Sequence, residues 1–374
     1  MSEELLIVAG EISGDLHAAD VVRAAKARMP DLRFWGIGGE RMRTEGVETV
    51  EDAERMAVMG LAEILRHYRF IKGVFRRILK EVDRRGTRRA LLVDYPGFNL
   101  RLAAELKKRD VEVFYYISPK VWAWNARRIP RMARSIDRLF AIFPFEPAVF
   151  ANSGLRTEFV GHPLVGQIDD FLAMPEAPLP WDSDRRVALL PGSRRQEIER
   201  ILPAMLAAAE RLEERFSDLS FLIATPSRRI DRLVRETLEG ASERPERLAI
   251  VCGAAREAMR QARAAIVASG TATLETALVG TPHVLTYRTS AFTYELGRRL
   301  VRVPFIGLVN VVLNRAATPE LIQHDATPER LAKAVGEILE DTPKRAGMLE
   351  DFRVLRETLG DGRPAERVAL ALGE

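Results

Sequence analysis

Small and polar residues gather where one predicted strand passes directly into a helix. The strand Ala264–Ala268 runs through the turn Ser269-Gly270-Thr271, and Glu275 follows one helical turn later. The first N–H groups of a helix have no partner within it, so they form a site for an anion such as phosphate. Glu275 is placed to reach a ribose hydroxyl. This junction therefore predicts a nucleotide-binding site.

A second junction of the same kind lies upstream. The strand Val187–Leu190 ends at Pro191-Gly192-Ser193, and Arg194 opens the next helix. Either junction alone is equally well explained as an ordinary turn of an α/β sheet. Two such helix starts, with an arginine at one and a glutamate at the other, favour a nucleotide diphosphate and, more narrowly, a nucleotide-sugar.

A carboxylate suited to general-base catalysis lies in the first half of the chain. Asp94 ends the strand Ala90–Val93 and precedes the stiff turn Tyr95–Asn99. A carboxylate at the carboxyl end of a parallel strand points toward the ligand cleft. As a base, Asp94 would need burial to raise its pKa from about 3.9 toward neutrality. The alternative is that Asp94 caps the next helix or orders the turn.

The first predicted strand ends in an acidic, hydroxylic loop that contains Glu11, Ser13, Gly14 and Asp15. Such a loop could contact the hydroxyl groups of a sugar. The simpler alternative is that its polar side chains cap the following helix. The loop lacks the GxGxxG fingerprint, so a dinucleotide is not indicated.

Metal and nucleophile sites find little support. The five histidines are scattered, without the spacing of metal ligands. Asp182 and Asp184 form the DxD pattern of one metal-dependent glycosyltransferase class, but a solvated turn explains them better. The single cysteine, Cys252, excludes an internal disulfide, and we expect it to be a small buried hydrophobe.

Buried strands alternate with amphipathic helices along the chain, which is typical of parallel, doubly wound sheets. The predicted strands are Leu5–Ala9, Arg33–Ile37, Ala90–Val93, Val111–Ile117, Arg138–Ile142, Glu158–Val160, Val187–Leu190, Phe221–Ala224, Leu248–Cys252, Ala264–Ala268 and His283–Tyr287. The proline-rich segment Met174–Pro180 interrupts this pattern as a linker would. We therefore predict two Rossmann-like domains, residues 1–165 and 166–348, with parallel sheets facing a central cleft.

Composition excludes several classes of protein. The chain has 374 residues, 47% hydrophobic and 29% charged, which fits about two globular domains. No apolar run approaches the ~20 residues of a membrane-spanning helix. The acidic start Met1–Glu4 is unlike a signal peptide, so we expect a cytoplasmic location. The net charge of +4, the 7% aromatic content and the lack of a recognition motif argue against a nucleic-acid partner.

The segment Arg66–Arg89 is strongly basic, with ten Lys and Arg residues against two acids. Its apolar residues recur with a helical period. One interpretation is a core-facing helix with a solvated basic side. The other is a helix that rests on anionic lipid.

Seven motifs spread over essentially the whole chain carry a family resemblance. They are Val8–Asp15, Met56–Glu63, Ser118–Trp124, Phe143–Glu146, Gly161–Pro163, Leu189–Arg194 and Ala268–Glu275. In these motifs and their order the chain resembles the lipid A disaccharide synthases, inverting GT-B glycosyltransferases of Gram-negative envelope synthesis.

The resemblance implies transfer from UDP-2,3-diacylglucosamine to 2,3-diacylglucosamine 1-phosphate (lipid X), which yields the β-1,6-linked disaccharide 1-phosphate and UDP. Asp94 would be the catalytic base. Donor and UDP would lie against the second domain, at Ser193, Arg194, Ser269, Gly270, Thr271, Glu275 and Asn310. The acceptor would lie toward the first, at Glu11, Ser13, Gly14, Asp15, Asn99 and Trp122. We expect no metal or other cofactor, because Arg194 and helix N–H groups can stabilise the departing diphosphate.

Two positions depart from the family pattern. The family often has a second aspartate where this chain has Gly97, which leaves Asp94 as the only carboxylate of its loop. Lys120 stands where a small polar residue is common, and its effect stays open.

The family's last helix typically packs on the other domain or on a partner subunit. Residues 349–374 fit such a segment, so a monomer and a homodimer are both compatible with the sequence. A lipid substrate also implies peripheral association with the inner face of the inner membrane.

Other proteins would share the Ser269–Glu275 turn. They are a peptidoglycan N-acetylglucosaminyltransferase, a UDP-N-acetylglucosamine epimerase and a non-catalytic nucleotide-sugar binding protein. The motifs Met56–Glu63 and Ser118–Trp124 argue against the first two.

Overall fold

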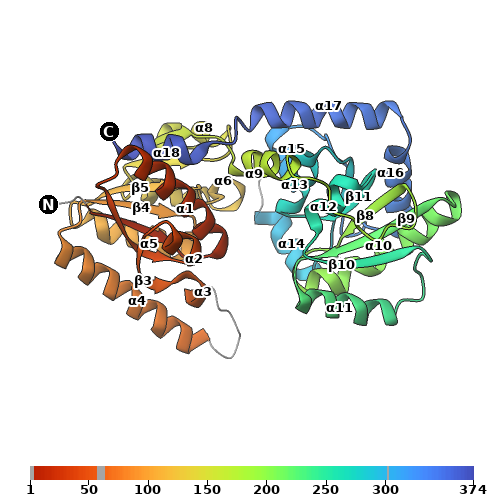
Figure 1. The fold of residues 1–374 in the computed structure, drawn as a ribbon, viewed down its shortest axis with the longest axis horizontal. Coiled ribbons are helices and arrows are strands. Elements are labelled where there is room, and N and C mark those ends of the chain that lie inside the picture. Colours follow the sequence, from red (N-terminus) through yellow and green to blue (C-terminus); the bar gives the residue numbers. More distant parts are fainter. Residues whose placement is uncertain (1–3, 57–63, 301–302) are drawn as a thin grey trace. The chain divides into compact units, whose positions relative to one another are not determined.

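The computed structural model describes residues 4–56, 64–300 and 303–374 and divides into two compact units (Figure 1). The first unit combines Met1–Pro163 with Leu359–Glu374, and the second is Leu164–Thr358. Each unit surrounds its own parallel sheet with helices. The prediction of an α/β protein with two doubly wound sheets is therefore confirmed.

The first unit contains a seven-stranded parallel sheet of order β3-β2-β1-β4-β5-β6-β7. Its strands are β1 (Glu4–Ala9), β2 (Arg33–Gly38), β3 (Glu48–Asp52), β4 (Arg89–Val93), β5 (Glu112–Tyr116), β6 (Arg138–Ala141) and β7 (Arg156–Phe159). Its helices are α1 (Ile12–Arg28), α2 (Glu40–Thr44), α3 (Ala53–Met56), α4 (Ile64–Arg85), α5 (Pro96–Lys107), α6 (Val121–Trp124), η2 (Ala126–Arg128), α7 (Ile129–Ala133), α8 (Glu146–Phe150), η3 (Ala151–Ser153) and α18 (Pro364–Leu372).

The second unit contains a six-stranded parallel sheet of order β10-β9-β8-β11-β12-β13. Its strands are β8 (Arg185–Leu190), β9 (Leu219–Thr225), β10 (Leu248–Cys252), β11 (Ala264–Ala268), β12 (His283–Tyr287) and β13 (Glu320–Ile322). Helix α9 (Pro163–Leu172) leads into it, and its other helices are α10 (Arg195–Arg215), α11 (Arg228–Glu239), α12 (Ala255–Gln261), α13 (Thr271–Val279), α14 (Ala291–Leu300), α15 (Leu308–Leu313), α16 (Pro328–Leu339) and α17 (Pro343–Thr358).

Both sheets reverse their strand order at one point, and ligands of such sheets bind beside that point at the carboxyl ends of the strands. In the first sheet the reversal lies between β1 and β4, where Ala9 pairs with Val93. In the second it lies between β8 and β11, where Leu190 pairs with Val267. The loops after these four strands are those that the sequence marked as candidate sites.

The two strands absent from the sequence prediction, β3 and β13, are edge strands. An edge strand keeps one side in solvent, so it lacks the continuous apolar run by which central strands are recognised. Strand β3 carries Glu48, Glu51 and Asp52, and β13 has only three residues. Cys252 ends the opposite edge strand β10 and is exposed, so the expectation that it is buried was wrong.

Helix α4 packs its apolar stripe on the core of the first unit. Val74, Ile78 and Val82 are buried there, and Phe75 and Leu79 are half-buried against the same cluster. The apolar stripe of this helix therefore faces the core, whereas contact of its basic side with lipid stays a prediction.

The segment expected at residues 349–374 is shared between the units. Helix α17 ends at Thr358 in the second unit, and α18 packs against α1 in the first (Figure 1). Several hydrogen bonds hold the returning chain in the first unit, among them two near its start. The His162 N–H donates to the Leu359 carbonyl at 2.9 Å, and an Arg367 N–H donates to the Val160 carbonyl at 2.7 Å.

Candidate active site

Asp94 and Tyr95 form a strained turn between β4 and α5. Both residues have left-handed backbone angles, with φ of 47° and 49°. Such angles are uncommon for residues other than glycine, and they concentrate at functional sites. Pro96 then opens α5. The Tyr95 ring lies so close to Gly10 that a Cβ added at residue 10 would be 2.3 Å from Tyr95 Cδ1.

Three hydrogen bonds hold the main chain of Asp94 in this conformation. Its N–H donates to the Tyr116 carbonyl at 2.9 Å. Its carbonyl accepts the Tyr115 hydroxyl at 2.6 Å and the Asn99 Nδ2 amide at 2.8 Å. Asn99 is fully buried, and its Nδ2 also lies 3.2 Å from the Val93 carbonyl. We therefore assign Asn99 to positioning the Asp94 loop, whereas the sequence suggested acceptor contact.

The surroundings of Asp94 favour its protonated form until near neutral pH. Burial, followed by the nearby negative charge of Glu11, raises the pKa of Asp94 to about 6. The Tyr95 backbone N–H and the positive charge of Lys120 act in the opposite direction. A carboxyl group with a pKa near 6 accepts a proton more readily than an ordinary aspartate, as a general base must.

Glu11 and Ser13 lie beside this loop with exposed side chains, since they follow β1, the neighbour of β4. The Glu11 side chain makes no capping hydrogen bond to α1, so the capping alternative does not hold for it. Gly14 is buried, and a Cβ there would lie 3.4 Å from Ala9 Cβ. The loop thus presents polar groups at the edge where Asp94 lies.

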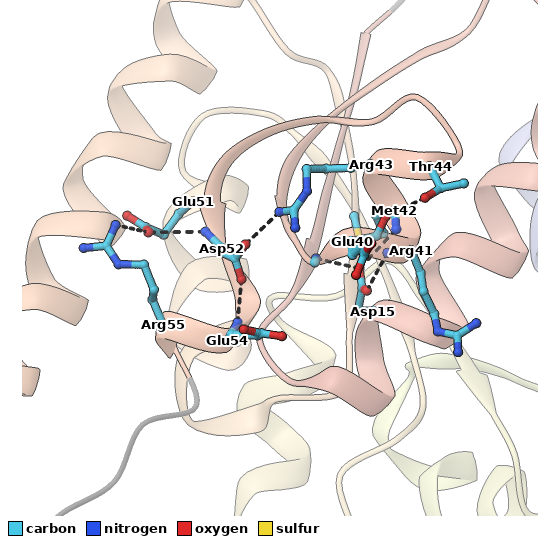
Figure 2. Close-up of polar contacts among 11 residues, drawn as sticks. Asp15, Glu40, Arg41, Met42, Arg43, Thr44, Glu51, Asp52, Glu54 and Arg55 are labelled. Atoms are coloured by element: carbon cyan, nitrogen blue, oxygen red, sulfur yellow. Dashed lines mark hydrogen bonds and ion pairs between the residues drawn. The ribbon is translucent and has the colours of Figure 1, made fainter.

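Asp15 has a structural role (Figure 2). It is buried, and its carboxylate accepts three backbone N–H groups at the start of α2. The donors are Gly39 at 2.6 Å, Arg41 at 3.1 Å and Met42 at 3.2 Å. A carboxylate at a helix N-terminus satisfies N–H groups that have no partner within the helix. We therefore remove Asp15 from the residues proposed to contact the acceptor.

Trp122 joins a buried carboxyl group that the sequence did not single out as a site. Its Nε1–H donates to Glu146 Oε1 at 3.1 Å, and the Phe143 N–H donates to Glu146 Oε2 at 3.1 Å. Glu146 has no exposed surface, and burial raises its pKa to about 7 despite these bonds. His162 packs on Phe143, and burial together with the charges of His17 and Lys120 lowers its pKa to about 3.

Glu146 should make the stability of the protein depend on pH. The raised pKa means that the folded state keeps a proton that the unfolded state releases between about pH 4.5 and 7. The stability that the folded state gains from keeping this proton is fully present below about pH 4.5. It is lost as the pH rises through about 7. We expect wild type to lose stability over this range relative to Glu146→Gln in urea unfolding. Exposed Glu112→Gln is the control, and parallel curves for wild type and Glu146→Gln would contradict the prediction.

The turn between β11 and α13 offers unpaired backbone donors. Gly270 (φ 153°) is the N-cap of α13, and no side chain caps this helix start. The N–H groups of Gly270, Thr271 and Ala272 donate to no partner within the described part of the chain. The Ser269 N–H is not free, because it donates to the Thr286 carbonyl at 3.0 Å. The backbone donors that this turn leaves for an anion are therefore those of Gly270, Thr271 and Ala272.

The neighbouring helix start, at α10, is already capped. Glu197 Oε2 accepts the backbone N–H groups of Ser193 at 3.0 Å and Arg194 at 3.2 Å. Its Oε1 accepts a hydrogen bond from Nη1 of the Arg194 guanidinium at 3.1 Å. Gly192 (φ 105°) lies so close that a Cβ there would be 2.4 Å from Glu197 Oε2. Free N–H groups at Ser193, which the sequence suggested, are thus not present. The exposed Arg194 guanidinium is the group that this turn can offer an anion.

The remaining two donor-site candidates differ in their availability. Glu275 Oε1 accepts two hydrogen bonds from Arg256, at 3.0 and 2.8 Å, whereas no partner within the described residues occupies its Oε2. Asn310 is buried, and its amide group donates to Thr318 and Glu320 while its oxygen accepts the Thr318 N–H. Asn310 therefore shapes the segment between α15 and β13.

Three sequence-based expectations can be compared only with the residues that the structure describes. Residues 57–63 of the motif Met56–Glu63 lie outside the described residues. Over the described ranges, no group of three or more His, Cys, Asp or Glu side chains is arranged to hold a metal ion. Within those same ranges, no helix combines the length and apolar character needed to span a bilayer.

Comparison with known proteins identifies close relatives. The family described as lipid-A-disaccharide synthetase matches residues 5–363. A lipid-A-disaccharide synthase from Syntrophus aciditrophicus (strain SB) is 41% identical over 372 residues, covering 99% of this chain and 97% of the relative. One from Geobacter sulfurreducens is 39% identical over 371 residues, covering 98% and 96%.

Solved structures of other enzymes share the fold. A UDP-GlcNAc 2-epimerase from Neisseria meningitidis, bound to UDP-GlcNAc, matches with a TM-score of 0.68 at 10% identity and 99% coverage of both chains. The calicheamicin glycosyltransferase CalG4 matches with a TM-score of 0.63 at 14% identity, covering 100% of this chain and 99% of that one. At this low identity the likeness concerns the fold alone, and that fold is GT-B.

Proposed function

The chain belongs to the lipid-A-disaccharide synthetase family, and from this premise we propose that it transfers a diacylglucosamine unit from UDP to lipid X. It is thus a glycosyltransferase of lipid A biosynthesis. The products are the β-1,6-linked disaccharide 1-phosphate and UDP. An epimerase or a peptidoglycan glycosyltransferase is not favoured, because the family matches nearly the whole chain. The same match argues against a non-catalytic binding protein.

The main support for this proposal is the environment of Asp94. It is the only carboxylate in its loop, burial raises its pKa to about 6, and three hydrogen bonds hold its strained backbone. As general base, Asp94 takes the proton from the 6-hydroxyl of lipid X while that oxygen attacks the anomeric carbon of the donor. Inversion follows, because the hydroxyl attacks from the face opposite UDP. Glu11 and Ser13 contribute polar contacts to the acceptor.

The second unit stabilises the leaving group. Negative charge grows on the diphosphate as the bond to the sugar breaks, and fixed N–H groups and cations lower the energy of that state. The N–H groups of Gly270, Thr271 and Ala272 and the Arg194 guanidinium supply these partners. The free Glu275 oxygen is available for a ribose hydroxyl.

Release of UDP tests the function directly. Purified protein should release UDP from UDP-2,3-diacylglucosamine when lipid X is present, and the disaccharide 1-phosphate should appear in equal amount by mass spectrometry. Each substrate alone is the control. Epimerisation of UDP-N-acetylglucosamine without any acceptor would instead favour the epimerase alternative.

We propose that the reaction needs no metal ion, because Arg194 and three helix N–H groups can balance the diphosphate charge. Turnover should therefore persist after dialysis against EDTA. Strict restoration by Mg²⁺ would contradict this prediction and return attention to Asp182 and Asp184. A metal-dependent DxD glycosyltransferase treated in parallel serves as the positive control.

We also propose that the solvated side of α4 rests on the inner face of the inner membrane, where the lipid substrates reside. Arg77 is paired with Glu51, and Arg85 with Glu48, so part of the positive charge counted in the sequence is neutralised. Arg76 and Lys80 are exposed and pair with no carboxylate among the described residues. These two cations, like the exposed Arg69, Lys72 and Arg88, which also form no ion pair among the described residues, are available to anionic lipid.

The double variant Arg76→Glu, Lys80→Glu should bind anionic vesicles at least about tenfold more weakly, since each basic residue contributes ~1 kcal/mol near the surface. Vesicle co-sedimentation at low and high salt measures this. The exposed pair Arg228→Glu, Arg232→Glu on α11 makes the same charge change elsewhere and is the control. Equal binding of wild type to neutral vesicles would count against the proposal.

Dimerisation stays a prediction from the family resemblance, which sedimentation velocity would test.

A further inference from the structure

Two cavities meet at helix α5, directly after the Asp94 loop. Gly97 and Arg101 line both of them. One cavity, of about 330 Å³, lies between α4 and α5. The other, of about 180 Å³, lies between α5 and the segment formed by η2 and α7. The base and the two cavities thus share one stretch of chain.

The larger cavity is mainly apolar. Ile71 and Phe75 line it from α4, and Tyr95 and Phe98 line it from the Asp94 loop and α5. The rings of Phe75 and Phe98 meet edge to face with their centroids 5.5 Å apart, which gives the cavity a firm wall. Such a surface favours a hydrocarbon group over a polar one.

The smaller cavity carries three arginines, Arg101, Arg128 and Arg131, together with the buried Ser135. None of the three arginines forms an ion pair with a carboxylate in the described part of the chain. Other arginines of the first unit are paired, for example Arg109 with Asp83 at 3.0 Å and Arg138 with Glu158 at 2.9 Å.

Three unpaired guanidinium groups around one cavity repel one another, and an anion among them removes that repulsion. A phosphate fits best, because its oxygens match the fork of donors on each arginine. The Arg128 guanidinium lies over the Trp124 ring, with 5.5 Å from its Cζ to the ring centroid, which favours this position of the side chain.

We propose that the paired cavities bind the acceptor lipid, with its 1-phosphate among Arg101, Arg128 and Arg131 and an acyl chain along Ile71, Phe75 and Phe98. This inference rests on the proposed function and deepens it. Lipid X carries its phosphate and its acyl chains at neighbouring carbons of one sugar. A cationic cavity and an apolar cavity that adjoin one another match this arrangement. Its reactive 6-hydroxyl is on the other side of the ring.

Steady-state kinetics of Arg101→Gln, Arg131→Gln test the polar cavity. The KM for lipid X should rise at least tenfold, while the KM for the donor, kcat and calorimetric UDP binding stay unchanged. With an acceptor that lacks the 1-phosphate, variant and wild type should have the same KM. Arg134→Gln, exposed beside α7 but outside both cavities, should behave as wild type.

The apolar cavity is tested by Ile71→Trp, which fills it. The KM should rise for acceptors with long acyl chains and stay constant for their acetyl counterparts. An unchanged KM for lipid X in the arginine variant, or an equal loss with the dephosphorylated acceptor, would overturn the proposal. So would weaker vesicle binding with an unchanged KM for detergent-dispersed lipid X, because the arginines would then serve the membrane. Failure of wild type to turn over would instead reject the proposed function.

Discussion

Replacing Asp94 by asparagine is expected to lower turnover by at least about 100-fold, the typical contribution of a general base. Asparagine has nearly the same shape and tolerates the left-handed backbone that residue 94 adopts. It cannot accept the proton of the acceptor hydroxyl. Because burial disfavours the charged carboxylate, the neutral amide should leave the fold intact.

The pH profile gives this prediction a second measurement. In wild type kcat/KM should rise with pH until Asp94 is deprotonated, around its pKa of about 6, and then level off. The residual activity of Asp94→Asn should lack this rise, and its calorimetric affinity for UDP should equal that of wild type.

Asp110→Asn is a matched control, since Asp110 is also an aspartate with a positive φ, of 55°, and it is exposed beyond the other end of α5. Near-normal turnover in folded Asp94→Asn would remove Asp94 from the mechanism.

Replacing Arg194 by alanine is expected to weaken UDP binding by about 10- to 150-fold. This range corresponds to the ~1.5–3 kcal/mol of a hydrogen bond to a charged group. The backbone cap of α10 should survive, because Glu197 accepts the N–H groups of residues 193 and 194 regardless of the side chain there. The effect should therefore report on the guanidinium alone.

Calorimetry with UDP and with uridine separates the phosphate contribution from the rest. Arg194→Ala should lose affinity for UDP and keep the affinity of wild type for uridine. Arg195→Ala is the control, because Arg195 is the next residue and pairs with Glu199 at 2.9 Å on the helix surface. An equal loss for uridine would show that Arg194 acts through the shape of the pocket and not on the diphosphate.

The sequence allowed prediction of the features that depend on local pattern. An apolar run followed by small or acidic residues predicts a buried central strand with a polar loop at its carboxyl end. Asp94, after β4, and Thr271, after β11, lie in such loops as expected. The pKa of Asp94 is raised in the direction that its predicted role requires.

The features that depend on partners distant in sequence could not be predicted. Asp15 accepts N–H groups at the start of α2, the first of them from Gly39, 24 residues later, and nothing in its own loop indicates this partner. Asn310 is engaged by Thr318 and Glu320 across a chain reversal. Glu146 belongs to the motif Phe143–Glu146, yet its pKa is raised by burial in the folded chain, and its hydrogen-bond donor Trp122 lies 24 residues earlier.

The return of the chain to its first unit bears on how the protein is synthesised. Domains generally fold in order as they leave the ribosome. Here α1 packs against α18, and α18 is translated only after the whole second unit. The later-made unit is the continuous one, so it can reach its native state first, while the buried surface of α1 remains uncovered. We expect that interval to make the nascent first unit dependent on chaperones.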